Sequence, residues 1–307
     1  MKIAMMATGG VGGYFGGRLA ATGEDVHFIA RGAHLAALKA DGLQLKSANG
    51  DLHLKPVSVT DNPATIGAVD IVIFAVKQYD TEAAANAIKP LIGAQTGVIT
   101  VQNGVDRHER LRAILGRDHV MGGAAYITGA EIAAPGVIVH LGKVARLIFG
   151  EFDGRASARG ERLLAACKKA GIDAAFSADV VKEMWAKFAL LSAFSGVSSL
   201  TRAPIGPVRS DPDMRKLLID SIAEAVAVGK AKGIDLGADY IARQMTLADS
   251  LPPATKSSME IDLDHGRRLE LDWLSGAVAR LGEELGVPTP TQRVIYAALK
   301  PYANGKG

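Results

Sequence analysis

The 307-residue sequence predicts an α/β fold, with a doubly wound, largely parallel sheet in residues 1–177 and an all-α domain in residues 178–307. Three observations lead to this prediction. The chain opens as strand, glycine-rich turn, helix and strand. Apolar runs of strand length then alternate with helical patterns as far as Phe176. After Ser177 only helical patterns follow, so we place the domain boundary near residue 177.

The opening strand, turn and helix predict a dinucleotide-binding unit. Residues 3–6 form a short apolar run without charge, as expected of a strand that is buried on both faces. Phe15, Leu19 and Ala20 then lie on one helical face. Backbone N–H groups at the start of such a helix receive a pyrophosphate. A glycine-rich turn without any ligand is the alternative.

The spacing of the glycines refines this prediction. In the usual G-x-G-x-x-G pattern, the first glycine makes the tight turn, the second lets the backbone approach the phosphates, and the third lets the helix pack on the strand. Here Ala7 takes the first position, whereas Gly9 and Gly12 are retained. Ala7 should carry a cost only if its φ angle is positive. The candidate cofactor-binding turn comprises Ala7, Thr8, Gly9, Gly10, Val11 and Gly12.

The end of the second strand indicates which dinucleotide binds. An NAD-specific unit usually places Asp or Glu there, whereas Arg accommodates the 2′-phosphate of NADP. This strand ends at Arg31, and no acidic residue lies between Asp25 and Asp41. We therefore expect NADP(H) as the cofactor. The alternative is that Arg31 is an ordinary exposed cation at a strand end.

Two further polar residues follow buried strands. Residues 69–76 and 97–101 are apolar runs with β-branched character. Lys77 directly follows the first run, and Asn103 lies two residues after the second. Ligands of doubly wound sheets bind beyond the carboxyl ends of the strands. We therefore expect Lys77 and Asn103 to lie at the same edge of the sheet as the glycine turn.

Composition narrows the possible functions. The chain has 35 basic and 32 acidic residues, and a net charge of +3 gives no argument for nucleic-acid binding. No apolar stretch reaches the length of a membrane span, and the first strand starts at once after Met1, which leaves no room for a signal peptide. The single cysteine, Cys167, lies in an apolar helical setting and is expected to be buried and unreactive. His140 and His265 lack metal-ligand spacing, so no metal site is predicted.

Five features, in order along the whole chain, resemble the ketopantoate reductase (2-dehydropantoate 2-reductase) family. They are MKIAMMATGGVGGYFGGRLA, Lys77, VQNGVD around Asn103, WAKFALLSAFSGVSSLTR, and SSMEIDLDHGRRLELDWLSG. The resemblance implies a Rossmann-like N-terminal domain that binds NADPH. It also implies reduction of ketopantoate to pantoate for pantothenate and coenzyme A synthesis.

The resemblance further implies roles for single residues. The matched positions are catalytic Lys187 and Glu270, substrate-binding Ser258, Asn103 beside the nicotinamide and the substrate, cofactor-contacting Lys77, and Arg31 at the 2′-phosphate.

Three positions depart from the family pattern. The best-known members carry Asn at three positions that contact ketopantoate, and here these are Leu191, Ser195 and a residue near Ile205. Lys187, Leu191 and Ser195 recur at intervals of four residues and share one helical face. We expect that face to line the substrate cleft. The substrate should then be a 2-keto acid with a less polar tail than ketopantoate, or the selectivity should be looser.

Lys187 is the candidate proton donor. Reduction of a ketone needs a hydride, which the cofactor supplies, and a proton donor aimed at the carbonyl oxygen. Lys187 interrupts a nearly all-apolar helix, between Trp185 and Phe188. Such a setting can ease proton release near neutral pH. The alternative is a salt bridge with Glu183 on a solvated edge.

Glu270 and Ser258 could also have purely structural roles instead of the catalytic and substrate-binding roles that the resemblance implies. On a helix, Glu270 and Asp272 would point about 200° apart, so only one of them could face a cleft. Glu270 could instead favour a helix dipole or pair with Arg267. Ser258 could be a helix-start residue.

These observations together predict a cytoplasmic, NADPH-dependent 2-keto acid reductase, with ketopantoate as the first candidate substrate and no nucleic-acid or membrane partner. The alternatives are a paralogous reductase of another 2-keto acid, a β-hydroxyacid dehydrogenase and a non-catalytic NADPH-binding sensor. A homodimer is also expected, unless the apolar residues of the last helices form the core of their own domain. These residues are Trp273, Leu274, Val278 and Leu281.

Overall fold

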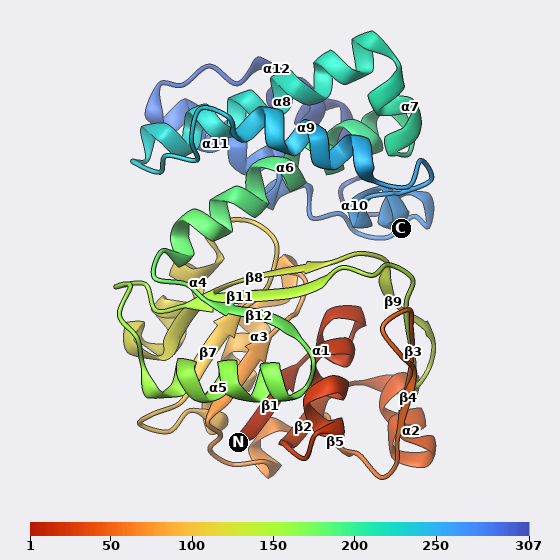
Figure 1. Ribbon diagram of the computed structural model, residues 1–307, viewed down its shortest axis with the longest axis vertical. Coiled ribbons are helices and arrows are strands. Elements are labelled where there is room, and N and C mark those ends of the chain that lie inside the picture. The colour runs from red at the N-terminus through yellow and green to blue at the C-terminus, as the bar shows by residue number, and fades with distance from the viewer. Residues whose placement is uncertain (307) are drawn as a thin grey trace. The chain divides into compact units, whose positions relative to one another are not determined.

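The computed structural model describes residues 1–306, which group into two units (Figure 1). The first unit comprises Met1–Gln102 and Asp106–Glu183, and the second comprises Asn103–Val105 and the chain from Met184 on. The division after Glu183 falls inside the helix α6 (Val180–Thr201), a few residues beyond the boundary expected near residue 177.

The first unit is built on a sheet of eight strands among the described residues, in the order β12-β11-β8-β7-β6-β1-β2-β5. All neighbouring strands are parallel except β8 and β11, which are antiparallel. The predicted doubly wound, largely parallel sheet is therefore confirmed. The strands are β1 (Lys2–Met6), β2 (Asp25–Ile29), β5 (Ser58–Thr60), β6 (Ile71–Phe74), β7 (Gly97–Thr100), β8 (Val120–Ile127), β11 (Ala145–Gly150) and β12 (Asp173–Phe176).

Helices cover both faces of this sheet, and the alternation of buried residues in the strands explains how. In β1, Ile3 and Met5 pack in one apolar cluster with residues of α1 (Gly10–Ala21), α2 (Gly32–Asp41) and α5 (Ala158–Lys169). Ala4 and Met6 pack in the opposite cluster with α3 (Thr81–Ala87) and α4 (Arg107–Leu115). Because successive strand residues point to opposite faces, an all-apolar strand needs helices on both sides. In Figure 1, α5 runs across the near face of the sheet.

A second, small sheet has the order β4-β3-β10-β9 and packs against α1. Glycines in α1 permit the close approach. A Cβ on Gly10 would lie 2.1 Å from the carbonyl oxygen of Ala130, and one on Gly13 would lie 2.7 Å from the Ile138 side chain. The strands are β3 (Leu43–Ser47), β4 (Leu52–Leu54), β9 (Ala130–Ala134) and β10 (Val137–His140).

The second unit contains helices and loops but no strand among its described residues, as predicted. Asp211 caps α8 by accepting hydrogen bonds from two backbone N–H groups, and Pro212 takes the first helical position. Pro252 and Pro253 separate α9 from α10. The helices after α6 are α7 (Ile205–Ser210), α8 (Pro212–Ala231), α9 (Tyr240–Ser250), α10 (Ser258–Asp264), α11 (Ser275–Leu285) and α12 (Pro290–Leu299).

The apolar residues of the last helices form the core of this unit. Leu274, Val278 and Leu281 are buried, Trp273 is half-buried, and α11 packs against α8 and α12. They therefore supply little exposed apolar surface, and the expected homodimer remains a prediction that these residues do not support.

Short 3₁₀ segments complete the described chain, and one of them corrects a helix prediction. The sequence pattern predicts one helix from Thr81 to Ile92, but α3 ends at Ala87 and a 3₁₀ turn follows. Pro90 explains the early end, since it lacks an N–H group and disfavours helical geometry at the preceding residue. The 3₁₀ segments are η1 (Pro63–Thr65), η2 (Gln78–Asp80), η3 (Lys89–Leu91), η4 (Arg117–His119), η5 (Leu271–Trp273) and η6 (Lys300–Tyr302).

Two predictions from composition can be compared with the structure. Cys167 is buried in α5, and burial raises the pKa of its thiol to about 12, so it is not a reactive nucleophile. Among residues 1–306, no helix combines the length and the apolar character that crossing a bilayer would require.

Candidate functional site

The glycine turn lies at the point where the strand order of the large sheet reverses. The chain passes from β1 to β2 on one side and later returns to β6 on the other side of β1. Ligands of open α/β sheets bind in the crevice beyond the carboxyl ends of the strands at such a point. The turn of residues 7–9 follows the carboxyl end of β1, and Lys77 follows the carboxyl end of β6.

Backbone geometry explains each key position of the turn. Ala7 has a φ of 78°, which is the left-handed region that glycine adopts easily and alanine does not. A Cβ on Gly12 would lie 2.0 Å from the carbonyl oxygen of Ala7, so only glycine lets the helix approach the turn here. A Cβ on Gly9 would meet nothing within 4 Å, which leaves room for a ligand against the backbone. The φ angle of Ala7 is therefore positive, and this conformation costs the alanine free energy that a glycine would not pay.

Thr8 and His34 hold the turn in place. Both the backbone N–H and the hydroxyl of Thr8 donate to the Ile29 carbonyl at the end of β2. His34 accepts from the backbone N–H of Gly136 at Nδ1 (3.0 Å), so its Nε2 carries the proton and donates to the Thr8 carbonyl (2.8 Å). Burial lowers the pKa of His34, which favours this neutral form.

Arg31 and Lys77 both stand at the starts of helical segments beyond strand ends. Arg31 is the exposed N-cap residue of α2, two residues after β2. Lys77 is the partly exposed N-cap residue of η2, three residues after β6. The exposed guanidinium of Arg31 is of the type that pairs with a phosphate.

In the second unit, one asparagine bridges the two predicted catalytic residues. Lys187 Nζ donates to Asn103 Oδ1 (3.0 Å), and Asn103 Nδ2 donates to Glu270 Oε2 (3.1 Å). An ammonium only donates and an ionised carboxylate only accepts, so these partners fix the orientation of the amide. Three residues that are far apart in the sequence therefore form one chain of polar contacts. We call it the lysine–asparagine–glutamate triad.

Buried apolar residues flank the lysine of this triad along α6. Lys187 is half-buried in α6, whereas Trp185 and Phe188 are buried and meet edge to face at 5.4 Å. Tyr240 donates a hydrogen bond from its hydroxyl to the carbonyl of Ala186, beside the lysine. The sequence left open a salt bridge between Lys187 and Glu183 as the alternative, and in the structure the Lys187 ammonium donates to Asn103.

The acidic residues around Glu270 have separate partners. Glu270 is buried at the N-cap of the 3₁₀ segment η5 and not on a helix, which corrects the helical geometry assumed from the sequence. Asp272 accepts from the Tyr296 hydroxyl at 2.9 Å. Arg267 lies 3.6 Å from Asp262, so it pairs there and not with Glu270.

The predicted substrate-binding residues are placed in different surroundings. Leu191 is half-buried, whereas Ser195 is fully buried and its hydroxyl has no hydrogen-bond partner within the described residues. Ile205 is buried at the start of α7. Ser258 is exposed at the first position of α10, and its neighbour Ser257 is the N-cap. Of these residues, Leu191 and Ser258 are accessible to a small molecule in this structure.

Sequence reasoning missed a group of buried polar residues beside the predicted cofactor site. Gln78, Thr81 and Gln102 lie near Lys77 and Asn103 in the sequence and are almost completely buried. One feature of the sequence could have indicated this group: a polar residue, Gln102, directly follows the apolar run of residues 97–101.

The architecture and the turn together define a class of protein. A doubly wound sheet with a glycine turn at its reversal point, followed by a helical unit, is the plan of a Rossmann-type oxidoreductase. Two family models identify the family: the model for ketopantoate reductase PanE/ApbA matches residues 3–154, and that for its C-terminal region matches residues 179–303. The chain therefore belongs to the ketopantoate reductase family.

Individual relatives agree over the full length. A 2-dehydropantoate 2-reductase of Mesorhizobium japonicum is 33% identical, with 100% of this chain and 99% of the relative covered. The crystal structure of a PanE/ApbA family ketopantoate reductase from Ralstonia eutropha is 33% identical, with a TM-score of 0.90 over 99% of this chain and 98% of that one. A 2-dehydropantoate 2-reductase structure from Geobacter metallireducens is 30% identical, with a TM-score of 0.92 over 98% of this chain and 99% of that one.

Proposed function

We propose that this enzyme reduces a 2-keto acid to the corresponding 2-hydroxy acid with NADPH, and that 2-dehydropantoate is the first substrate to test. The observation that carries the proposal is the lysine–asparagine–glutamate triad, in which Lys187 donates to Asn103 and Asn103 donates to Glu270. Family membership supports the same reaction, since the relatives are named for it.

The residues of the triad have separate tasks in this reaction. The bound cofactor supplies a hydride, which forms a C–H bond at the ketone carbon. The carbonyl oxygen gains negative charge, and the Lys187 ammonium donates a proton to it, so the product is a neutral hydroxyl. Asn103 holds the ammonium, and Glu270 prevents the amide from turning over. Lys187 is half-buried, so its ammonium is partly shielded from water while Asn103 holds it.

Residues of the first unit suit the cofactor. The N-terminus of α1 and the open space at Gly9 fit a pyrophosphate. Arg31, two residues after the second strand, supports a preference for the 2′-phosphate of NADP(H) over NAD(H). Lys77 is proposed to contact the cofactor from the end of β6.

The substrate tail is proposed to be less polar than the family pattern implies. Leu191, Ser195 and Ile205 stand where the best-known relatives carry asparagine, and only Leu191 is accessible. An apolar side chain discriminates weakly between a hydroxylated and a plain tail. We therefore propose either loose selectivity or a preference for a plain aliphatic 2-keto acid. Ser258 remains a proposed substrate contact, and a cytoplasmic role in pantothenate synthesis follows if ketopantoate is preferred.

A substrate panel tests the proposal. Purified protein is assayed by NADPH consumption with ketopantoate, 2-ketoisovalerate and pyruvate, and by NADP⁺ reduction with 3-hydroxy acids. We expect turnover with branched 2-keto acids and none with 3-hydroxy acids. Turnover of 3-hydroxy acids alone would instead identify a β-hydroxyacid dehydrogenase. NADPH binding without turnover of any substrate would identify a cofactor sensor.

A further inference from the structure

A chain of buried polar groups joins the two turns that carry Lys77 and Asn103. Gln78 follows Lys77 and Gln102 precedes Asn103, and the side chains of Gln78, Gln102 and Thr81 are 0%, 4% and 0% exposed. The Gln102 side-chain amide donates to the Thr81 hydroxyl (2.8 Å), and this hydroxyl donates to the Gln78 carbonyl (2.8 Å). The Thr81 hydroxyl is therefore the junction between the two turns.

The far ends of this chain are also fixed. The Thr100 hydroxyl, at the end of β7, donates to Gln102 Oε1 (3.1 Å). Arg110 from α4 donates to both the side-chain and the backbone oxygen of Gln78, at 2.9 and 3.0 Å. The same guanidinium makes two contacts of 2.6 Å to Glu82, and these hydrogen bonds lower the pKa of the Glu82 carboxyl. The turn after β6 is thus held from α3, from α4 and from the end of β7.

Burial of the network residues directs their neighbours outward. The backbone at Lys77 has φ −64° and ψ 149°, which is polyproline II geometry, and in this geometry adjacent side chains point in different directions around the chain axis. Gln78 is buried, so Lys77 is turned away from the core. Gln102 is likewise buried, and the adjacent Asn103 is half-buried.

We propose that Gln78, Thr81 and Gln102 are positioning residues, which hold the turn of Lys77 in the conformation that binds the cofactor. The inference rests on the proposed function, because it assumes that NADPH binds at this edge of the sheet. These residues do not touch the cofactor in the proposal, and they act through Lys77 and the backbone.

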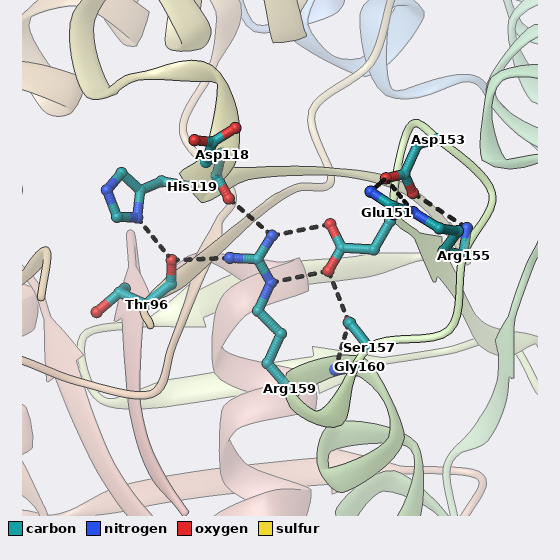
Figure 2. A network of polar contacts seen from close by, with 9 residues as sticks. All are labelled: Thr96, Asp118, His119, Glu151, Asp153, Arg155, Ser157, Arg159 and Gly160. Atoms are coloured by element: carbon teal, nitrogen blue, oxygen red, sulfur yellow. Dashed lines mark hydrogen bonds and ion pairs between the residues drawn. The ribbon is translucent and has the colours of Figure 1, made fainter. Parts of the chain in front are cut away.

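A second polar network lies at the other end of β7 and provides a control for the test of this proposal. Thr96 precedes β7, and its carbonyl accepts from Arg159 (3.2 Å) and from His119 (3.0 Å). Figure 2 shows this network, in which Arg159 also makes two contacts of 2.8 Å to Glu151. Ser157 caps α5 and donates to Glu151 at 2.6 Å. The network lies at the amino end of β7, away from the carboxyl edge where ligands bind.

The test compares three variants of the full-length protein. Thr81→Val keeps the shape of the side chain but removes the junction hydroxyl, whereas Thr81→Ser retains the hydroxyl. Ser157→Ala removes a cap and a hydrogen bond from the control network. NADPH affinity is measured by fluorescence titration, thermal stability by calorimetry, and kcat and KM with a 2-keto acid by NADPH consumption.

We expect Thr81→Val to weaken NADPH binding about tenfold, since a buried donor loses its acceptor and the turn loosens. Thr81→Ser should bind NADPH like the unmodified protein. Ser157→Ala should lower the melting temperature and leave NADPH affinity and KM unchanged. If Thr81→Val also lowers only the melting temperature, the network is merely structural and the inference is wrong.

Two further outcomes separate this inference from the proposed function. If no 2-keto acid is reduced but NADPH binds, the proposed function fails, and the affinities of the Thr81 variants still decide the inference. If the unmodified protein binds no NADPH, both are wrong. Should Thr81→Val not fold, Gln102→Met removes the same hydrogen bond from the other side, and the same loss of affinity is expected.

Discussion

The glycine turn of the first unit and the triad of the second unit are built from different parts of the chain. The turn is local, since the backbone of residues 7–12 joins one strand to the next helix. In the triad, Asn103 is 84 residues from Lys187 and 167 residues from Glu270. The turn depends on backbone conformation, whereas the triad depends on the identity of each side chain. Substitutions in the triad should therefore change the rate of reaction most, and those in the turn should change stability or cofactor affinity.

The largest effect is expected from Lys187→Ala. Without the proton donor, kcat should fall by about 10² to 10⁴-fold, the range typical of general acid catalysis. NADPH affinity should change little, because the donor acts on the carbonyl oxygen. Steady-state kinetics and a fluorescence titration measure the two effects. Lys182→Ala, at an exposed position of the same helix, is the control and should behave like the unmodified protein. A near-normal kcat in Lys187→Ala would show that the lysine is structural.

A smaller loss is expected from Glu270→Gln. Glutamine has a similar shape and can still accept from Asn103, but its hydrogen bond lacks the assistance of a charge. We expect kcat/KM for the 2-keto acid to fall by about tenfold or somewhat more, because a charge-assisted hydrogen bond is roughly twice as strong as a neutral one. Asp272→Asn is the matched control, because Asp272 accepts from Tyr296 instead. Equal effects of the two substitutions would contradict a special role for Glu270.

The next effect concerns the choice of cofactor in the first unit. Arg31→Ala should lower kcat/KM for NADPH by about tenfold, because a charge-assisted contact to the 2′-phosphate is lost. The value for NADH should stay nearly constant, so the preference for NADPH disappears. Arg155→Ala, at an exposed arginine elsewhere, serves as the control. Equal efficiency with NADH and NADPH in the unmodified protein would rule out this role of Arg31.

The smallest effect is expected from Ala7→Gly, which changes stability rather than rate. Ala7 has a positive φ that costs an L-residue about 1 kcal/mol, and glycine removes this strain. The melting temperature should rise by a few degrees. Calorimetry with and without NADPH measures the change, and a lower melting temperature would mean that the alanine methyl group makes a favourable contact.

The sequence predicted the fold well, because each element has a local signature. The apolar run at Ile71–Phe74 marks a strand that is buried on both faces, and Asp211 with Pro212 marks the start of a helix. The end of α3 at Ala87 was missed, although Pro90 signals it. The pattern of Glu270 and Asp272 does not reveal a 3₁₀ segment, since a short segment has too few residues for a period.

The candidate site could be predicted only in part. The glycine spacing pointed to the turn, but the positive φ of Ala7 has no signal in the sequence, because alanine rarely adopts it. Lys187 and Glu270 came from the family resemblance, and only the structure shows Asn103 between them. Contacts between residues that are far apart in the chain leave no periodic pattern. For the same reason, the link from Gln102 through Thr81 was not predicted.

The most direct test of the central claim, reduction of a 2-keto acid by hydride transfer from NADPH, follows a label. The unmodified protein is mixed with excess ketopantoate and NADPH that carries deuterium at both positions of the nicotinamide C4. The products are then analysed by mass spectrometry and NMR. We expect one deuterium at carbon 2 of pantoate for each NADPH oxidised. Pantoate without deuterium, or oxidation of NADPH without any hydroxy acid product, would contradict the proposed reaction.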